Sequence, residues 1–166
     1  METHYKHTQV GRMTLITFGV CLLVDAAVSA YVLSVPDLDL SFRIGPLVTF
    51  IVFAVLMAHF GTLTVTLYDE FLVVRFGPGP IRKKLALKDI ESCQIVKNPW
   101  YYGWGIHRIR KGWLYNVSGF GAVELKTKNG RKYRIGTDVP DELQRAISQS
   151  LTSMARHRKP TDRKKL

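Results

Sequence analysis

The chain has 166 residues, enough for one domain of ordinary size or for a smaller domain with a membrane anchor. Its composition, with 46% hydrophobic residues, 22% charged residues and two cysteines, excludes a disordered chain, a collagen-like repeat and a disulfide scaffold. Residues 1–60 hold three Lys/Arg and four Asp/Glu (net −1), whereas residues 61–166 hold 21 and nine (net +12). This asymmetry predicts an apolar membrane part followed by a basic domain that faces an anionic surface.

Two apolar segments follow a short N-terminal tail, residues 1–12. Met13–Val35 has 23 residues and a single charge, Asp25, and Ile44–Leu63 has 20 residues without Asp, Glu, Lys or Arg. At about 1.5 Å per residue, each helix would cover a hydrocarbon core of about 30 Å. The intervening residues suffice only for a tight turn. We therefore predict a transmembrane helical hairpin over residues 13–63.

Basic residues flank the two outer ends of this hairpin, whereas its turn carries Arg43 against Asp37 and Asp39. The positive-inside rule therefore places both termini in the cytoplasm and the turn outside. In a rival reading, the first span is a cleaved signal peptide, because Val28-Ser29-Ala30 offers small residues near a plausible cleavage point. The length of the apolar run and the aspartate inside it favour the membrane span.

Asp25 lies near mid-span, where a carboxylate usually faces protein or water. It can hydrogen-bond within the hairpin, to Thr49 or Ser29, and fix helix packing. It can also contact another membrane subunit, or serve transport. Ala26 and Ala30 form a small-xxx-small pair that permits close helix contact, so we include them with Asp25 among the candidate partner-binding residues.

Beyond the hairpin the hydrophobic period changes to two, which predicts strands. Seven are expected, at residues 62–67, 71–76, 81–87, 90–97, 106–110, 122–127 and 132–135, the last two flanking the hairpin signal Asn129-Gly130. A helix is expected from Pro140, with a stripe at Leu143, Ile147, Leu151 and Met154. We assign residues 64–156 to a cytoplasmic domain and residues 157–166 to a basic tail.

Seven antiparallel strands closed by a C-terminal amphipathic helix resemble the pleckstrin-homology (PH) superfold. The stretches Gly103–Ile106, Trp113–Gly119, Ala122–Leu125 and Arg134–Asp138 are similar to those of uncharacterised bacterial membrane proteins with a PH-like domain. The resemblance implies a multi-pass protein of the bacterial inner membrane with two spans. The implied fold class is a membrane helical hairpin plus a mainly-β, α+β PH-like domain. Most such families have no assigned activity.

Residue patterns for catalysis or cofactor binding do not stand out. Cys21 and Cys93 fall in a span and a strand, the five histidines are scattered, and no metal-binding, Walker or dinucleotide motif occurs. We therefore expect a protein that is not an enzyme and that has no cofactor or metal.

Seven of the 18 aromatic residues fall between positions 100 and 120, including every tryptophan. Several could fill the domain core. Alternatively, they form an exposed patch that docks a partner or rests at the bilayer interface, where Trp and Tyr are favoured. The candidate partner-binding residues from this segment are Trp100, Tyr101, Tyr102, Trp104 and Trp113.

Clustered basic residues suggest contact with the anionic inner leaflet, where each Lys or Arg can contribute about 1 kcal/mol. The candidates are Arg82, Lys83, Lys84, Arg108, Arg110, Lys111, Arg156, Arg158, Lys159, Arg163, Lys164 and Lys165. A solvated basic surface is the plain alternative, and no nucleic-acid-binding pattern accompanies the charge.

These observations favour a non-enzymatic, membrane-anchored binding or scaffold protein, an accessory or assembly subunit of a larger membrane complex. Its expected partners are membrane lipids and either other membrane subunits or a second copy of the chain. The alternative is a stand-alone reader of anionic lipid or of a small acidic ligand.

Overall fold

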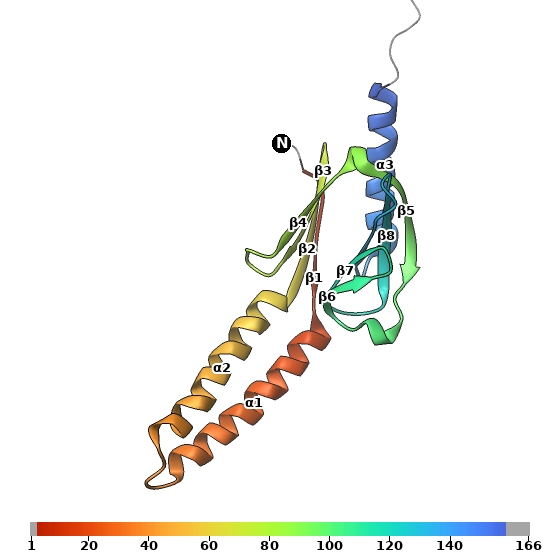
Figure 1. The fold of residues 1–166 in the computed structure, drawn as a ribbon. Helices are drawn as coiled ribbons and strands as arrows, with labels where there is room; N and C mark the ends of the chain where they lie inside the picture. The colour runs from red at the N-terminus through yellow and green to blue at the C-terminus, as the bar shows by residue number, and fades with distance from the viewer. Residues whose placement is uncertain (1–2, 159–166) are drawn as a thin grey trace, which may run out of the picture.

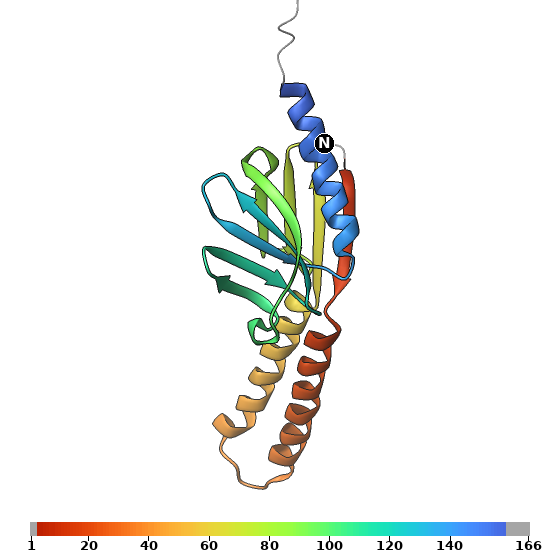
Figure 2. The same ribbon diagram turned by 90° about the vertical axis from the view of Figure 1, so that its right-hand side faces the viewer.

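The structure is a computed structural model that describes residues 3–158, with side chains as far as Arg156. A long helical hairpin projects from one end of a β-rich domain, which a C-terminal helix closes (Figures 1 and 2). The elements in chain order are β1 (Thr3–Val10), α1 (Arg12–Ser34), α2 (Leu40–Phe60), β2 (Thr62–Tyr68), β3 (Phe71–Phe76), β4 (Arg82–Ala86), the 3₁₀ turn η1 (Leu87–Asp89), β5 (Ile90–Lys97), the 3₁₀ turn η2 (Trp100–Tyr102), β6 (Gly105–Ile109), β7 (Gly112–Asn116), β8 (Gly121–Thr127), β9 (Lys132–Gly136) and α3 (Pro140–Arg158).

Within residues 3–158, two helices, α1 and α2, are long and apolar enough to span a membrane by length and composition. They expose large apolar side chains on their outer surface; Leu23, for example, is 73% exposed. A continuous apolar surface of this size is unfavourable in water and suits a lipid environment. The second helix begins at Leu40 instead of Ile44 and ends at Phe60, because Thr62 and Leu63 already belong to strand β2.

Thr3–Val10 is not a tail outside the domain but strand β1, which pairs antiparallel with β2 at the edge of the first sheet. Its inward-facing residues include Gln9, which is 5% exposed and donates a hydrogen bond to the Ser118 carbonyl oxygen at 3.1 Å. This strand escapes sequence analysis because its alternating side chains are mostly polar on both faces, so no hydrophobic period marks it.

The described strands form two sheets, with the orders β1-β2-β3-β4 and β5-β8-β9-β7-β6. All seven expected strands are present, and β1 and β7 raise the count over residues 3–158 to nine. β7 pairs parallel with β9, whereas the other pairs are antiparallel. The structure thus has a β-rich domain with one C-terminal helix, as expected, but with more strands than the PH resemblance implies.

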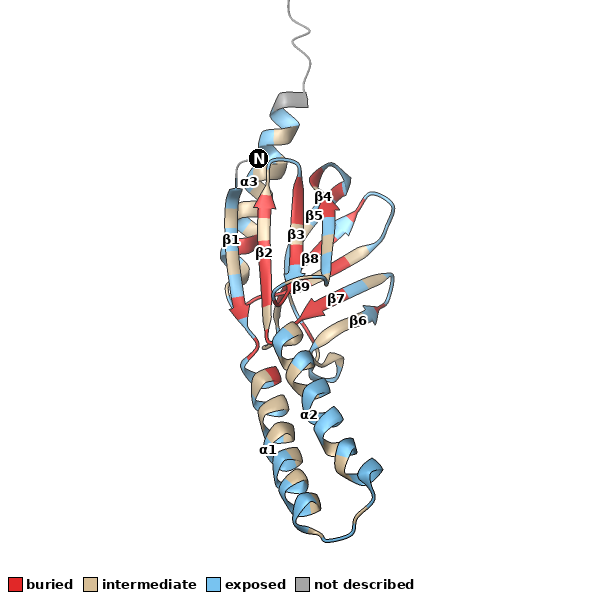
Figure 3. Ribbon diagram, turned by 90° about the vertical axis from the view of Figure 1, so that its left-hand side faces the viewer, coloured by how far each residue is buried: buried red, intermediate tan, exposed pale blue. Residues whose placement is uncertain are grey.

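The core lies between the inner faces of the two sheets and α3, and it appears in Figure 3 as red segments along the strands. Leu63, Leu67, Leu72 and Leu125 are at most 1% exposed. The expected stripe on α3 packs against this core: Leu143 and Ile147 are fully buried, and Leu151 and Met154 are partly buried. The apolar face of the helix thereby closes the open side of the two sheets.

The hairpin enters the domain without a linker. One residue separates α1 from β1 and one separates α2 from β2, and the Gly11 amide donates to the Gly61 carbonyl oxygen at 2.8 Å. The buried Thr14 hydroxyl, in the first turn of α1, donates to the Val117 carbonyl oxygen at 2.7 Å. The hairpin and the domain are therefore bound together by sheet pairing and by a buried contact to the second sheet.

The end of α2 also packs against the domain. The Phe60 and Phe76 rings meet edge to face with centroids 5.6 Å apart. Gly77 lies so close to α2 that an added Cβ would be 2.6 Å from the Ala58 carbonyl oxygen, and Gly77 also has a φ of 50°. Only glycine tolerates both conditions, and its presence lets the β3–β4 turn rest on the helix end.

Candidate binding surfaces

The middle of the hairpin places Asp25 on the side of α1 that faces α2. Phe18 of α1 and Phe53 of α2 are in ring contact, with centroids 6.2 Å apart, and this register sets Asp25 seven residues further along, opposite Pro46. The Thr49 hydroxyl donates to the Gly45 carbonyl oxygen at 3.1 Å instead of to Asp25. The buried Asp25 Oδ2 has no partner among the described residues.

Ala26 and Ala30 are exposed on α1. A face with small side chains lets a second helix approach closely in lipid. The structure therefore leaves this small-xxx-small pair uncovered by the hairpin itself, whereas the Asp25 Oδ2 is buried on the side that faces α2.

The aromatic segment lies mostly outside the core. Trp100 is 80% exposed and Tyr101 67%, whereas Trp104 and Trp113 are 39% and 43% exposed. Tyr102 is half-buried, and the Arg134 guanidinium lies over its ring, 5.8 Å from the centroid. Of the expected patch, Trp100 and Tyr101 thus form the outermost part.

This segment lies at the hairpin end of the domain. In Figures 1 and 2, the green chain that follows β5 descends to the level at which α1 and α2 leave the sheets. Trp and Tyr favour that depth when the helices cross a bilayer.

The outer face of the first sheet carries cations and threonines. Strand pairing sets Lys6, Thr66, Val73 and Lys84 side by side across the sheet, and Arg75 beside Arg82 in the next row. A depression of about 870 Å³ on this face is lined by nine described residues, none of which is a carboxylate: Thr3, Lys6, Thr66, Tyr68, Phe71, Val73, Arg75, Arg82 and Lys84. We call this surface the basic wall.

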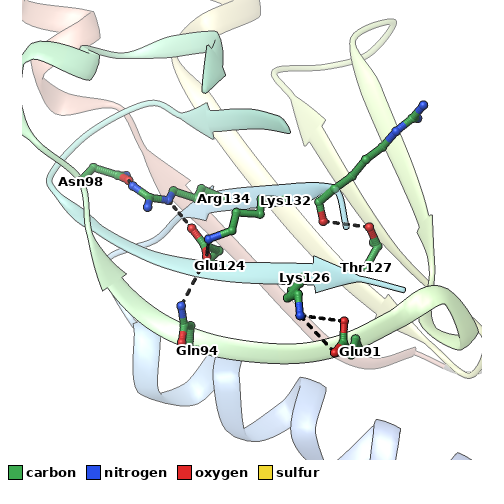
Figure 4. A network of polar contacts seen from close by, with 9 residues as sticks. Glu91, Gln94, Asn98, Glu124, Lys126, Thr127, Lys132 and Arg134 are labelled. Carbon is green, nitrogen blue, oxygen red and sulfur yellow. Dashed lines mark hydrogen bonds and ion pairs between the residues drawn. The ribbon is translucent and has the colours of Figure 1, made fainter. Parts of the chain in front are cut away.

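The outer face of the second sheet carries a buried ion cluster around Glu124 (Figure 4). Glu124 is 3% exposed and accepts hydrogen bonds from Lys132 Nζ and Arg134 Nε, each at 2.7 Å. Gln94 Nε2 adds a third bond at 3.3 Å. Burial by itself raises the pKa of Glu124, but the hydrogen bonds and charges of Lys132 and Arg134 outweigh burial and hold the pKa below its ordinary value.

The cations expected to contact lipid occupy different places. Arg82 and Lys84 belong to the basic wall, whereas Lys83 points inward, 5.7 Å from the centre of the Tyr133 ring. The cations of the β6–β7 hairpin lie together at one corner of the second sheet; they are Arg108, Arg110 and Lys111. Arg156 lies near the end of α3 that points away from the hairpin (Figure 1). The side chain of Arg158 and all of Lys159, Arg163, Lys164 and Lys165 lie outside the described residues.

Sequence reasoning named Arg82 and Lys84, but it missed Lys6 and Arg75 of the basic wall, and it missed the Glu124 cluster. Lys6 and Arg75 stand far apart in the chain and meet only through the β1–β2–β3 pairing. Glu124 had a detectable signal, since Ala122-Val123-Glu124-Leu125 places a carboxylate inside a strand that is otherwise apolar. In the part of the chain that the structure describes, no group of three or more His, Cys, Asp or Glu is arranged to hold a metal ion.

In comparisons with known proteins, the sequence matches no protein-family model, and it shows no significant similarity to a curated protein. The candidate surfaces are therefore interpreted from their own geometry and charge.

Proposed function

We propose that this chain is a non-enzymatic, membrane-anchored binding protein that serves as an accessory or assembly subunit of a larger membrane complex. The observation that carries the proposal is the junction without a linker, in which Gly11 bonds to Gly61 and Thr14 to Val117. A domain fixed in this way keeps one orientation relative to the membrane. Partner binding then costs little orientational entropy, which suits a structural subunit better than a mobile, tethered domain would.

The basic wall is the surface of the domain that we assign to an acidic protein partner. Its strands continue from the helices away from the hairpin (Figure 3), and Lys6 is five residues beyond Gly11, roughly 17 Å at about 3.4 Å per residue. This exceeds the Debye length of about 8 Å at physiological ionic strength, so lipid headgroups at the helix ends attract the row of Lys6 and Lys84 only weakly, whereas Arg75 and Arg82 lie two residues nearer to the hairpin. A row of cations without a carboxylate in the lining complements an acidic surface on another protein.

Within the membrane, we assign Ala26 and Ala30 to contact with a second transmembrane segment. Both are exposed on the outer surface of α1, whereas the Asp25 Oδ2 is buried on the side that faces α2. Small side chains on an exposed helix face let a second helix approach closely in lipid.

The test is extraction of the full chain from its native membranes in mild detergent, followed by sizing and mass spectrometry of the proteins that migrate with it. We expect a particle larger than one chain, and we expect Ala26→Leu/Ala30→Leu to release the partner, because the larger side chains hold the helices apart. Ala27→Leu is the matched control, since Ala27 is also exposed but points in another direction on α1. A chain that migrates alone, or a partner retained equally by all variants, would reject the proposal.

A second candidate function is that of an anionic-lipid reader, and the position of Trp100 and Tyr101 favours it. Both are exposed at the hairpin end of the domain, where interfacial aromatics would lie. In this reading, Arg108 and Arg110 of the neighbouring β6 hairpin contact headgroups.

We further propose a bacterial inner-membrane location with both ends of the described chain in the cytoplasm, and a PH-like origin for the domain. Strands β1–β4 with β5, β8 and β9 make seven antiparallel strands closed by α3. On this interpretation α1–α2 is inserted into the β1–β2 connection, and the β6–β7 hairpin is a second insertion. The parallel β7–β9 pairing supports it, because the inserted hairpin joins an otherwise antiparallel sheet at its edge.

A further inference from the structure

The turn that joins β6 to β7 lies between two hollows of the second sheet, and both hollows are basic. The first, of about 380 Å³, is lined by four cations, Arg110, Lys111, Lys132 and Arg134, together with Tyr102, Ile109 and the carboxylate of Glu124. The second, of about 530 Å³, is lined by Arg108, Lys111 and Arg131. Lys111 lines both.

The charge of the first hollow is unbalanced. Glu124 is the single carboxylate in its lining, against four cations. Lys132 and Arg134 each give one short hydrogen bond to Glu124, whereas no hydrogen bond to a carboxylate is found for Arg110 or Lys111 among the described residues. Gathering like charges raises the free energy of the folded chain, and a bound anion would lower it.

Two of the four cations, together with the backbone of the β6–β7 turn, are held in place before any ligand arrives. The Glu124 carboxylate holds the side chains of Lys132 and Arg134. The backbone amide of Lys132 donates a hydrogen bond to the Lys111 carbonyl oxygen at 2.9 Å. Gly112 has no room for a side chain, because an added Cβ would overlap the Lys132 carbonyl. The β6–β7 turn is thus pinned to β9. An anion in the hollow therefore meets two positioned cations, Lys132 and Arg134, and orders only the exposed side chains of Arg110 and Lys111.

We propose that Arg110, Lys111, Lys132 and Arg134 form a binding site for a phosphate group. Arginine presents several N–H donors in a planar fork that matches phosphate oxygens, and lysine adds a mobile point charge. The excess of three positive charges over the one carboxylate suits a phosphate better than a single carboxylate. This site is separate from the basic wall, and it does not depend on the proposed subunit role.

Two sources can supply that phosphate: the headgroup of an anionic phospholipid, or a soluble phosphate ester. β6 is the edge strand of the second sheet and lies at the side of the domain nearest the helices in Figure 3. A headgroup can therefore reach the β6–β7 corner from the bilayer. The hollow is also open to solvent, so a small phosphate ester can reach it from water.

The experiment uses the full chain in two arms. In the first, the chain in uncharged detergent is titrated calorimetrically with glycerol 3-phosphate. In the second, it is reconstituted in phosphatidylcholine nanodiscs with or without phosphatidylglycerol, and lipid retention is measured by native mass spectrometry. The test variant is Arg110→Gln/Lys111→Gln. The control is Lys88→Gln/Lys128→Gln, which removes the same charge from exposed positions outside both hollows.

We expect the test variant to lose at least about tenfold in affinity, and the control less than about twofold, because only the former removes charge-assisted hydrogen bonds. Loss in the lipid arm alone identifies a headgroup, and loss in the soluble arm alone identifies a phosphate ester. Loss in both identifies the shared phosphate chemistry. Equal binding by test and control variants, or no binding in either arm, would overturn the site.

Discussion

The amide of Gly11 donates a hydrogen bond to the carbonyl oxygen of Gly61, 2.8 Å away, at the point where both membrane-type helices enter the same sheet. Val10, which precedes Gly11, and Thr62, which follows Gly61, are directly paired in β1 and β2. The whole hairpin therefore occupies the place of a turn between two neighbouring strands. A domain built in this way is continuous with its anchor.

The first prediction is that the hairpin can be replaced by a true turn. Joining Gly11 to Gly61 through Asn-Gly in place of residues 12–60 should give a folded, soluble domain, because a two-residue Asn-Gly turn closes antiparallel strands at this separation. Dispersed amide resonances and a monomeric elution volume would confirm it. A chain of residues 62–166, which lacks β1, is the control; it should be less stable, because Tyr5 and Gln9 no longer pack against the domain.

The second prediction concerns Gly112. Gly112→Ala should destabilise the domain by about 3 kcal/mol, because its Cβ would overlap the Lys132 carbonyl and separate β7 from β9. At Gly79, by contrast, an added Cβ would have no neighbouring atom within 4 Å. Gly79→Ala should therefore change the free energy of unfolding by less than about 0.5 kcal/mol. Denaturant unfolding of the soluble domain measures both, and equal effects would refute the proposed packing of the β6–β7 hairpin.

The third prediction is a pH dependence at Glu124. Its pKa in the folded chain lies below the ordinary value of 4.5, so its ionised form stabilises the fold above that pH, and this contribution is lost as the pH falls through the folded pKa. At pH 7, Glu124→Gln should cost about 2 kcal/mol, because Lys132 and Arg134 lose their counter-charge. The difference from the parent chain should shrink progressively below pH 4.5. A difference that does not vary with pH would contradict the ion cluster.

The fourth prediction tests the depth of the aromatic segment. The variant Trp104→Phe/Trp113→Phe leaves Trp100 as the one tryptophan of the three. In nanodiscs, its fluorescence should be quenched more strongly by lipids brominated near the headgroup end of the chain than by lipids brominated near the tail end. Trp113 alone, in Trp100→Phe/Trp104→Phe, should be quenched less. Equal quenching of the two variants would contradict the placement of Trp100 at the bilayer interface.

Much of the fold follows from local patterns in the sequence. Thr62–Leu67 alternates and the strands around Asn129-Gly130 turn as their residues predict, and the Leu143–Ile147 stripe packs as expected. β1 does not follow from such a pattern, because its residues are mostly polar and its partner strand is separated from it by the whole hairpin. A strand held by backbone pairing and a few buried polar groups has no hydrophobic period to reveal it.

The candidate surfaces were harder to predict than the fold. Exposure of Trp100 agrees with one of the alternatives that the sequence left open, but the basic wall needs the register of four strands to unite Lys6 with Lys84. The hollow to which we assign phosphate binding likewise unites Arg110 with Lys132 through a parallel pairing between β7 and β9. Such long-range pairing is set by topology and carries no local signature.

The most direct test of rigid presentation is a distance distribution between spin labels at Val28, on the outer surface of α1, and Glu70, at the far turn of β2–β3, with both native cysteines replaced. The rises of helix and strand predict a separation of roughly 50 Å. In nanodiscs, double electron–electron resonance should give one narrow distribution, and a Gly-Ser insertion after Gly61 should broaden it. A broad distribution in the parent chain would contradict the account, since the domain would then be tethered and not fixed.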